Sequence, residues 1–303
     1  MDLSIIILNY NSADYLKKYL ESLDKSDLGG YHYEIIVVDN KSTDDSIKLA
    51  KSIETSNTKF LILDTNKGFA HGNNQGLTIT NSKSKYVLFL NPDTLVEKNT
   101  LKKMIYFFNQ NKKVDAATCQ IDLVLSNKMQ PECHRGFPTP WRSFCYFSGL
   151  IKLFPKSKLF SGYFLGHLDK TIPHPIEACV GAFLMVKRSV GQKIGWWNEK
   201  YFFYGEDLDF CYQLKQHNYN LYFYPYCKIS HFQGISSGII NKSQSLSGAS
   251  RKTKIMIAKA STQAMKIFYR ENLFKSYNFL TRFFVMQGIN LLTIYRVFKA
   301  KYL

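Results

Sequence analysis

Two stretches of sequence decide the fold: LSIIILNYNS at residues 3–12 and YEIIVVDNKS at residues 33–42. Each holds an unbroken apolar run, and each run ends in polar residues, Asn9 in the first and Asp39-Asn40 in the second. Unbroken apolar runs of this length are typical of parallel strands that helices cover on both faces. The two stretches therefore predict buried parallel strands whose ends present amide and carboxylate side chains.

The same alternation continues along the first hundred residues. Further apolar runs lie at 60–63 and 86–90, and apolar residues at helical spacing follow both Ser12, which can cap a helix, and Ser42. Shorter strands are expected at 114–119, 182–186 and 220–224. This order predicts an α/β, Rossmann-like fold with a mostly parallel central sheet and flanking helices. The fingerprint G-x-G-x-x-G is absent after the first strand, which argues against a classical dinucleotide-binding domain.

The charge of the chain is uneven. The 303 residues contain 40 Lys and Arg against 23 Asp and Glu, a net charge of +17 that predicts an anionic partner, and 45% hydrophobic residues exclude a disordered chain. Residues 251–303 alone hold eleven Lys and Arg and one acid, Glu271, so +10 lies there. We expect 251–303 to be a basic, amphipathic helical tail that contacts an anionic membrane. A helical bundle packed on the domain is the alternative.

The start of the chain lacks a basic region before a long apolar stretch, so it does not resemble a signal peptide. No run reaches the ~18 uncharged apolar residues of a spanning helix. The cysteines show no paired or zinc-like spacing, which predicts reduced thiols of a cytoplasmic protein. They are Cys119, Cys133, Cys145, Cys179, Cys211 and Cys227. The basic tail places this protein at the inner face of the cell membrane.

Polar residues gather where the predicted strands end, and open parallel sheets bind ligands at that edge. Asp39-Asn40, followed by Ser42, can read the edge of a nucleotide base beside the free N–H groups of a helix start. Asp93, in Asn91-Pro92-Asp93, follows the strand at 86–90, where a carboxylate suits a hard cation such as Mg²⁺ or Mn²⁺. Turn chemistry explains any one of these residues, but not their repetition.

Two other segments have residues suited to a catalytic site. The loop 66–76 has three glycines and three asparagines, which let the backbone approach a ligand closely. Glu206, Asp207 and Asp209 begin a predicted helix behind aromatic residues, where a partly desolvated carboxylate can act as a general base. Helix-dipole complementation accounts for one or two of these acids. His231 is a candidate metal ligand, with an ordinary packed histidine as the alternative.

In order and spacing, these segments resemble the inverting GT-A glycosyltransferases of family 2, over about residues 3 to 240. The matching segments are 4–11, 37–42, 66–76, 90–93, 179–184, 203–209 and 231–236. Within the family, the resemblance is to the rhamnosyltransferase-like branch that builds bacterial surface polysaccharides. It implies a nucleotide-sugar-binding half at residues 1–100, an acceptor-binding half at 101–250, and a separate tail.

The resemblance also implies roles for individual residues. Asp207 would be the catalytic base, with Glu206 and Asp209 as supporting acids, and Asp93 and His231 would bind Mg²⁺ or Mn²⁺. The residues implied for the nucleotide and donor are Asn9, Tyr10, Asp39, Asn40, Asn66, Gly68, Asn74, Asn91 and Arg251. Those implied for the acceptor side are Arg135, Trp141, Gly181, Trp196 and Trp197. The serine-rich segment 236–250 would be a mobile loop that closes over the donor.

The resemblance implies transfer of a sugar from dTDP-rhamnose or a UDP-hexose to a glycan or lipid-linked acceptor; the oligomeric state stays open. Asn91 stands where the family usually has an acid, which leaves one carboxylate for the metal, and Gln213 stands where many relatives have Arg. A nucleotidyltransferase is one alternative, but it calls for a Gly-rich basic signature after the first strand. A nucleic-acid-binding protein would interleave basic and aromatic residues across one face, whereas residues 1–250 are only mildly basic.

Overall fold

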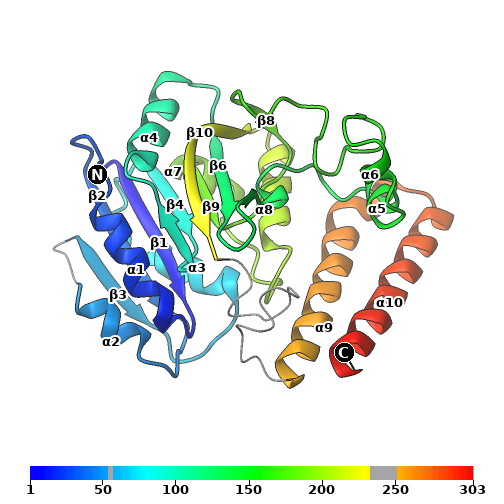
Figure 1. Ribbon diagram of the computed structural model, residues 1–303, viewed down its shortest axis with the longest axis horizontal. Coiled ribbons are helices and arrows are strands. Elements are labelled where there is room, and N and C mark those ends of the chain that lie inside the picture. The colour runs from blue at the N-terminus through cyan, green and yellow to red at the C-terminus, as the bar shows by residue number, and fades with distance from the viewer. Residues whose placement is uncertain (54–56, 233–250, 303) are drawn as a thin grey trace.

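The computed structural model describes residues 1–53, 57–232 and 251–302, and Figure 1 shows a twisted sheet with helices on both faces. The strands are β1 Leu3–Asn9, β2 Tyr33–Asp39, β3 Thr58–Ile62, β4 Tyr86–Leu90, β5 Thr94–Val96, β6 Ala116–Leu123, β7 Lys128–Met129, β8 His174–Ile176, β9 Phe183–Lys187 and β10 Leu221–His231. The α-helices are α1 Ala13–Asp24, α2 Ser46–Lys51, α3 Phe69–Thr78, α4 Thr100–Gln110, α5 Pro140–Phe147, α6 Leu150–Leu153, α7 Arg188–Ile194, α8 Glu206–Gln216, α9 Arg251–Phe268 and α10 Phe279–Tyr302. Short turns of other helix types lie at Pro131–Cys133, Tyr269–Leu273 and Phe274–Ser276.

The strands follow the order β3-β2-β1-β4-β9-β6-β10-β5 across the sheet. The first four are parallel to one another, as the unbroken apolar runs predict, and β9 is antiparallel to both β4 and β6. The register pairs Asn9 with Asp39 and Ile7 with Leu90, so the polar ends of β1 and β2 lie side by side. The predicted α/β fold with flanking helices is confirmed, and the second half of the sheet is mixed.

The starts of the first two helices differ from the prediction. The Ser12 hydroxyl donates to the side-chain carbonyl of Asn9, so it makes no capping bond with α1. The helix expected from Ser42 begins at Ser46 instead, because the Ser42 hydroxyl and backbone N–H both donate to the Asp39 carboxylate. The predicted mobile loop 236–250 lies outside the described residues.

The C-terminal tail forms two antiparallel helices, α9 and α10, beside the sheet (Figure 1). The turn that follows α9 is bonded to α8: the amide of Asn272 donates to Asp209 at 2.7 Å, and the Tyr212 hydroxyl donates to the Asn272 carbonyl at 2.8 Å. Phe268, at the end of α9, is buried. The tail therefore packs on the domain at this point. Across the described ranges, no helix combines the length and the apolar character needed to cross a membrane.

Candidate active site

The first cluster of predicted site residues forms around Asn9, at the end of β1. The amide of Asn9 donates to Asp39 at 2.8 Å, to Ser42 at 3.0 Å and to Ser46 at 2.8 Å. Asn9 is 0% exposed, so it holds Asp39 in place and presents no surface to a ligand. The predicted part of Asn9 in nucleotide binding stays a prediction, and it would act through Asp39. Tyr10, the next residue, is 49% exposed.

The loop after β3 lies against the end of β2. The amide nitrogen of Asn40 donates to the side chain of Asn66 at 2.9 Å and to the Gly68 carbonyl at 3.3 Å. The amide oxygen of Asn40 is buried, and no partner for it occurs among the described residues. A buried acceptor without a donor is costly, so this oxygen is suited to accept a hydrogen bond from a bound ligand.

Gly68 joins the loop 66–76 to the segment that precedes the acids of α8. Its φ of +97° is one that residues with a side chain rarely adopt, and a Cβ there would lie 2.2 Å from the Phe202 carbonyl oxygen. The backbone N–H of Phe69 donates to that same oxygen at 3.1 Å. Only glycine allows this close approach, which brings residues 66–69 to the start of α8.

A second bridge between the same segments involves Asn74. Its amide nitrogen donates to the Trp197 carbonyl at 2.9 Å and to Glu199 at 2.8 Å, while its oxygen accepts from the Trp197 N–H at 3.2 Å. His71 also lies 2.8 Å from Glu199. Asn74 therefore clamps α3 to residues 197–199 and lies against protein at both ends of its amide. Its predicted contact with the donor stays a prediction.

The aromatic residues predicted for the acceptor side occupy different places. Trp197 is only 2% exposed, and its ring lies 4.9 Å from Phe89 and 4.7 Å from Phe210, so it is a core residue and not part of an acceptor surface. Trp141 lies out on α5, where its indole N–H donates to the Leu159 carbonyl. A Cβ on Gly181 would lie 3.6 Å from Phe69, an ordinary contact.

The predicted metal ligands lie next to each other. The Nε2 atom of His231, at the end of β10, lies 3.1 Å from the Asp93 carboxylate, and its Nδ1 atom lies 2.8 Å from the side-chain oxygen of Gln130. Burial alone would raise the pKa of Asp93, but the charge and hydrogen bond of His231 outweigh it, so the pKa of this carboxyl lies below its usual value. Asn91, on the same turn, donates its backbone N–H to the Ala182 carbonyl.

The donor chemistry of this pair fits a divalent cation. Because Gln130 presents an oxygen, Nδ1 of His231 holds a proton, and Nε2 either donates to Asp93 as an imidazolium or offers a lone pair to a cation. A hydrogen bond on the other ring nitrogen is the usual way in which a ligating histidine is fixed. In residues 1–53, 57–232 and 251–302, no cluster of three His, Cys, Asp or Glu side chains could hold a metal. Phosphate and water oxygens would have to complete the shell, as Mg²⁺ commonly requires.

The acids at the start of α8 have different surroundings. Asp207 accepts from the Arg135 guanidinium at 2.7 Å and from the Leu208 N–H at 2.7 Å. Arg135 is itself buried, and although burial opposes its charge, the nearby Asp207 carboxylate raises its pKa above the ordinary value. Arg135 therefore keeps its positive charge beside the Asp207 carboxylate. Arg135, predicted on the acceptor side, is the direct partner of the predicted base.

Glu206 and Asp209 are less suited to take up a proton from substrate. Glu206 is buried, one of its carboxylate oxygens has no partner among the residues described, and burial together with the charge of Asp207 raises its pKa to about 8. It is therefore protonated at neutral pH. Asp209 is buried and accepts from Asn198, Tyr201 and Asn272, so it fixes the helix, the preceding loop and the tail to one another.

Arg251 begins α9, and its guanidinium lies 5.9 Å from the ring centre of Tyr302 at the end of α10. The described contacts thus place it on the tail, and its predicted reach to the donor diphosphate stays a prediction. Sequence reasoning missed Gln130, Ser46 and Phe202. Gln130 lies 101 positions before His231, and no local pattern marks it as a partner of that ring.

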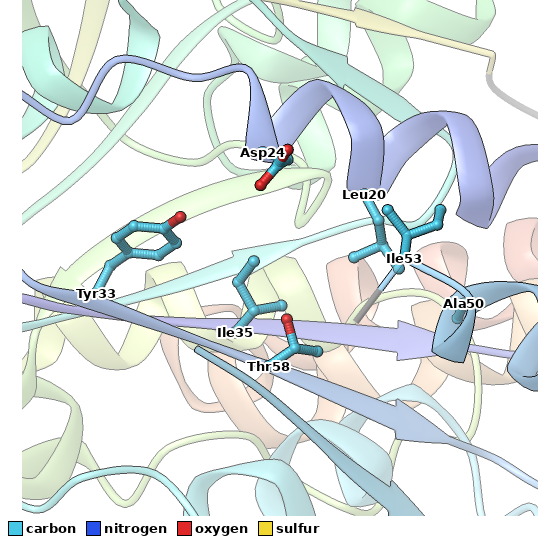
Figure 2. Close-up of a pocket in the computed structure, with 7 residues that line it drawn as sticks. All are labelled: Leu20, Asp24, Tyr33, Ile35, Ala50, Ile53 and Thr58. Atoms are coloured by element: carbon cyan, nitrogen blue, oxygen red, sulfur yellow. The ribbon is translucent and has the colours of Figure 1, made fainter. Parts of the chain in front are cut away.

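Two hollows do not include the predicted acids Asp39, Asp93 and Asp207. Figure 2 shows one of about 10 Å³ between α1 and β2, lined by Leu20, Asp24, Tyr33, Ile35, Ala50, Ile53 and Thr58, which is room for about one water molecule. The other is a groove of about 390 Å³ whose lining includes Asn74, Trp196 and Arg188. The guanidinium of Arg188 already donates to Ser84 and Thr80. Neither lining includes Asp39, Asp93 or Asp207, so neither hollow coincides with the strand-end site.

A family model described as glycosyl transferase family 2 matches residues 4–195, more than half of the chain. The chain belongs to glycosyl transferase family 2. This membership favours the glycosyltransferase over the nucleotidyltransferase alternative.

The chain is 27% identical over 241 residues to the rhamnosyltransferase WbbL of Escherichia coli, covering 75% of this chain and 82% of the relative. It is 28% identical over 222 residues to the hexosyltransferase Agl10 of Haloferax volcanii, covering 73% of this chain and 64% of the relative.

Solved structures share the fold of this family 2 glycosyltransferase. The mannosyltransferase PcManGT of Pyrobaculum calidifontis, solved with GDP-Man and Mn²⁺, has a TM-score of 0.58 at 14% identity, over 98% of this chain and 72% of that one. GalNAc-T7, solved with UDP, GalNAc and Mn²⁺, has a TM-score of 0.61 at 17% identity, over 90% of this chain and 49% of that one. TarS 1–349 of S. aureus has a TM-score of 0.51 at 18% identity, over 86% of this chain and 65% of that one.

Proposed function

We propose that this family 2 glycosyltransferase moves a sugar, with inversion, from a nucleoside-diphosphate sugar to a glycan or lipid-linked acceptor in bacterial surface polysaccharide synthesis. The observation that bears most on this is the Asp207 carboxylate, held by Arg135 at the start of a helix that Gly68 and Asn74 connect to the strand-end residues. The names of the relatives support it, since they include a rhamnosyltransferase and a hexosyltransferase. We propose dTDP-rhamnose or a UDP-hexose as the donor.

Asp207 is the proposed general base. Its carboxylate would take the proton of the acceptor hydroxyl, whose oxygen would form a bond to the anomeric carbon as the bond from that carbon to the diphosphate breaks. Attack from the face opposite the leaving group inverts the configuration. Glu206 is a poorer base because its raised pKa keeps it protonated at neutral pH. We propose that Glu206 supports Asp207 from the buried side of the helix.

The donor would lie across the ends of β1, β2 and β4. Asp39, which Asn9 and Ser42 hold in place, and the exposed ring of Tyr10 would contact the base. The unpartnered oxygen of Asn40 would accept a hydrogen bond from the nucleotide sugar, beside Gly68. When bound at Asp93 and His231, Mg²⁺ or Mn²⁺ would supply positive charge that stabilises the leaving diphosphate.

The tail is the proposed membrane contact. The large apolar residues that α10 leaves exposed recur at intervals of three, four and seven residues, which places them on one helical stripe. They are Phe279, Leu280, Phe283, Phe284, Leu291, Ile294, Tyr295, Phe298 and Tyr302. Residues 272–303 contain no acid, and Lys275, Arg282, Arg296, Lys299 and Lys301 supply positive charge. Such a helix is suited to lie on an anionic membrane at the cytoplasmic face.

A thermal-shift panel tests the donor proposal. The full chain would be heated with dTDP-rhamnose, UDP-glucose, UDP-galactose, UDP-GlcNAc or GDP-mannose, each with and without Mn²⁺. We expect one nucleotide to raise the melting temperature in the presence of Mn²⁺, because a ligand that binds only the folded state stabilises it. Asp93→Ala should remove the Mn²⁺ dependence, whereas Asp24→Ala, at an exposed acid away from the site, should leave it unchanged. No stabilisation by any nucleotide sugar would contradict the proposed function.

A further inference from the structure

A second exposed apolar surface lies between β7 and β8, on α5, α6 and the loop that follows. We call it the aromatic patch, and its members are Trp141, Phe144, Phe147, Leu153, Phe154 and Leu159. Leu153 is 72% exposed and Phe144 56%, although side chains of this kind are normally buried in a folded domain. Contiguous exposed apolar surface of this kind marks an interaction site.

The patch is a fixed surface, because its rings contact one another. The ring of Trp141 stacks on Phe144 with centroids 5.7 Å apart, and its N–H donates to the Leu159 carbonyl at 3.0 Å. Phe154 lies 4.9 Å from the ring of Phe160. The side chains are therefore held in position before any partner binds, which lowers the entropy cost of binding.

The segment that carries the patch has charges of one sign, although Glu177 from outside the segment pairs with Arg142 of α5. No Asp or Glu occurs from residue 133 to residue 168, whereas five Lys and Arg do. The three lysines among them, Lys152, Lys156 and Lys158, lie in the same segment as Leu153 and Leu159 and are exposed. Apolar side chains flanked by lysines complement a surface that has an apolar interior and an anionic outer layer. An acidic protein surface offers the anionic outer layer but not the apolar interior.

The patch and the tail lie at the same end of the molecule. In Figure 1, α5 and α6 lie with α9 and α10 on the side away from β3. Tyr146 of α5 is close enough to α10 for an electrostatic interaction: burial raises the pKa of its hydroxyl, and the positive charge of Arg296 opposes that shift. Two chain segments that are far apart in sequence thus expose apolar and basic side chains from neighbouring elements.

We propose that the aromatic patch is a second membrane-contact surface, which inserts its rings at the headgroup level of an anionic phospholipid bilayer while Lys152, Lys156 and Lys158 face lipid phosphates. This rests on the proposed membrane contact of α10 and adds a second point of attachment. One helix lying on a membrane makes a narrow line of contact, about which the domain can still rock by partial rotation. A second contact fixes that rotation, and with it the direction in which Asp207 faces a lipid-linked acceptor.

Vesicle binding by the full-length chain tests this proposal. The vesicles would be phosphatidylcholine alone or phosphatidylcholine mixed with phosphatidylglycerol. The patch variant is Phe144→Ser with Leu153→Ser, and the tail variant is Phe284→Ser with Leu291→Ser. The control is Tyr106→Ser with Ile62→Ser, which removes two large side chains of 57% exposure each from other elements. Circular dichroism of each variant checks that it is folded.

We expect the patch variant to bind mixed vesicles at least about tenfold more weakly than wild type, as the loss of two inserted side chains predicts, and the control to bind normally. Replacing the three lysines by glutamine should weaken binding to mixed vesicles by about fivefold per lysine and leave binding to phosphatidylcholine alone unchanged. Each result supports the proposal.

Other outcomes would overturn it. If wild type binds and only the tail variant is weakened, the patch is not a membrane contact, although the proposed tail contact stands. If wild type ignores both vesicles, the membrane proposals fail together, while the nucleotide thermal shift still tests the glycosyltransferase site. If the patch variant instead changes a dimer into a monomer in sedimentation, without a change in vesicle binding, the patch is an interface between copies of this chain.

Discussion

At the scale of single residues, the catalytic proposal rests on the hydrogen-bonded pair of Arg135 and Asp207. Asp207 is held by Arg135 at 2.7 Å, so Asp207→Asn removes the proposed base while keeping the shape of the side chain. We expect kcat to fall by about 10²–10⁴, the usual contribution of a general base, with donor affinity nearly unchanged. Single-turnover kinetics and nucleotide titration measure the two quantities. Turnover equal to that of wild type would remove Asp207 from this role.

Glu206 gives a prediction about stability and pH. Folded Glu206 keeps its proton up to about pH 8, while the ordinary value of 4.5 applies to the unfolded chain. Between those values the folded state binds the extra proton, so the stability of the wild type falls as pH rises through this window. Glu206→Gln should therefore raise the melting temperature more at pH 8 than at pH 5. Glu97→Gln, at an exposed acid, is the control, and equal shifts at both pH values would contradict the assignment.

At the scale of elements, the attachment of the tail depends on the contact between Asp209 and Asn272. Asn272→Ala removes a 2.7 Å hydrogen bond to a buried carboxylate, which should cost about 1–3 kcal/mol of unfolding free energy. Urea unfolding measures this loss, and Asn290→Ala, on α10, is the matched control. We also expect faster limited proteolysis within the tail. An unchanged urea midpoint and proteolysis rate would show that other contacts fix the tail to α8.

At the scale of the whole molecule, all six cysteines are buried and free. Burial raises the pKa of the Cys133 and Cys227 thiols to about 12, so these two are protonated and unreactive at neutral pH. We expect an aromatic disulfide reagent to modify none of the six quickly in the folded protein and all six in guanidinium chloride. Fast reaction in the folded state, or fewer than six reactive thiols after unfolding, would contradict the structure.

Elements with a strong local signal were predictable. The unbroken apolar runs of β1, β2 and β4 specify parallel buried strands, and the acids at 206, 207 and 209 do begin a helix. Helix starts were less predictable, because Ser12 and Ser42 use their hydroxyls in bonds to Asn9 and Asp39, three positions earlier in each case, instead of in capping. A serine before a helix offers one hydroxyl, and the sequence does not say which partner takes it.

The sequence by itself determined the family, the α/β fold and the strand ends at which polar residues gather, because apolar periodicity and short motifs are local properties of the chain. Only the tertiary structure decided which of those residues are buried and which residues pair with one another. It buried Asn9 beneath Asp39, placed Trp197 in the core, paired Arg135 with Asp207 and His231 with Gln130, and left the aromatic patch exposed. Burial and pairing depend on segments 30 to more than 100 positions apart, and these meet only when the sheet and its helices pack.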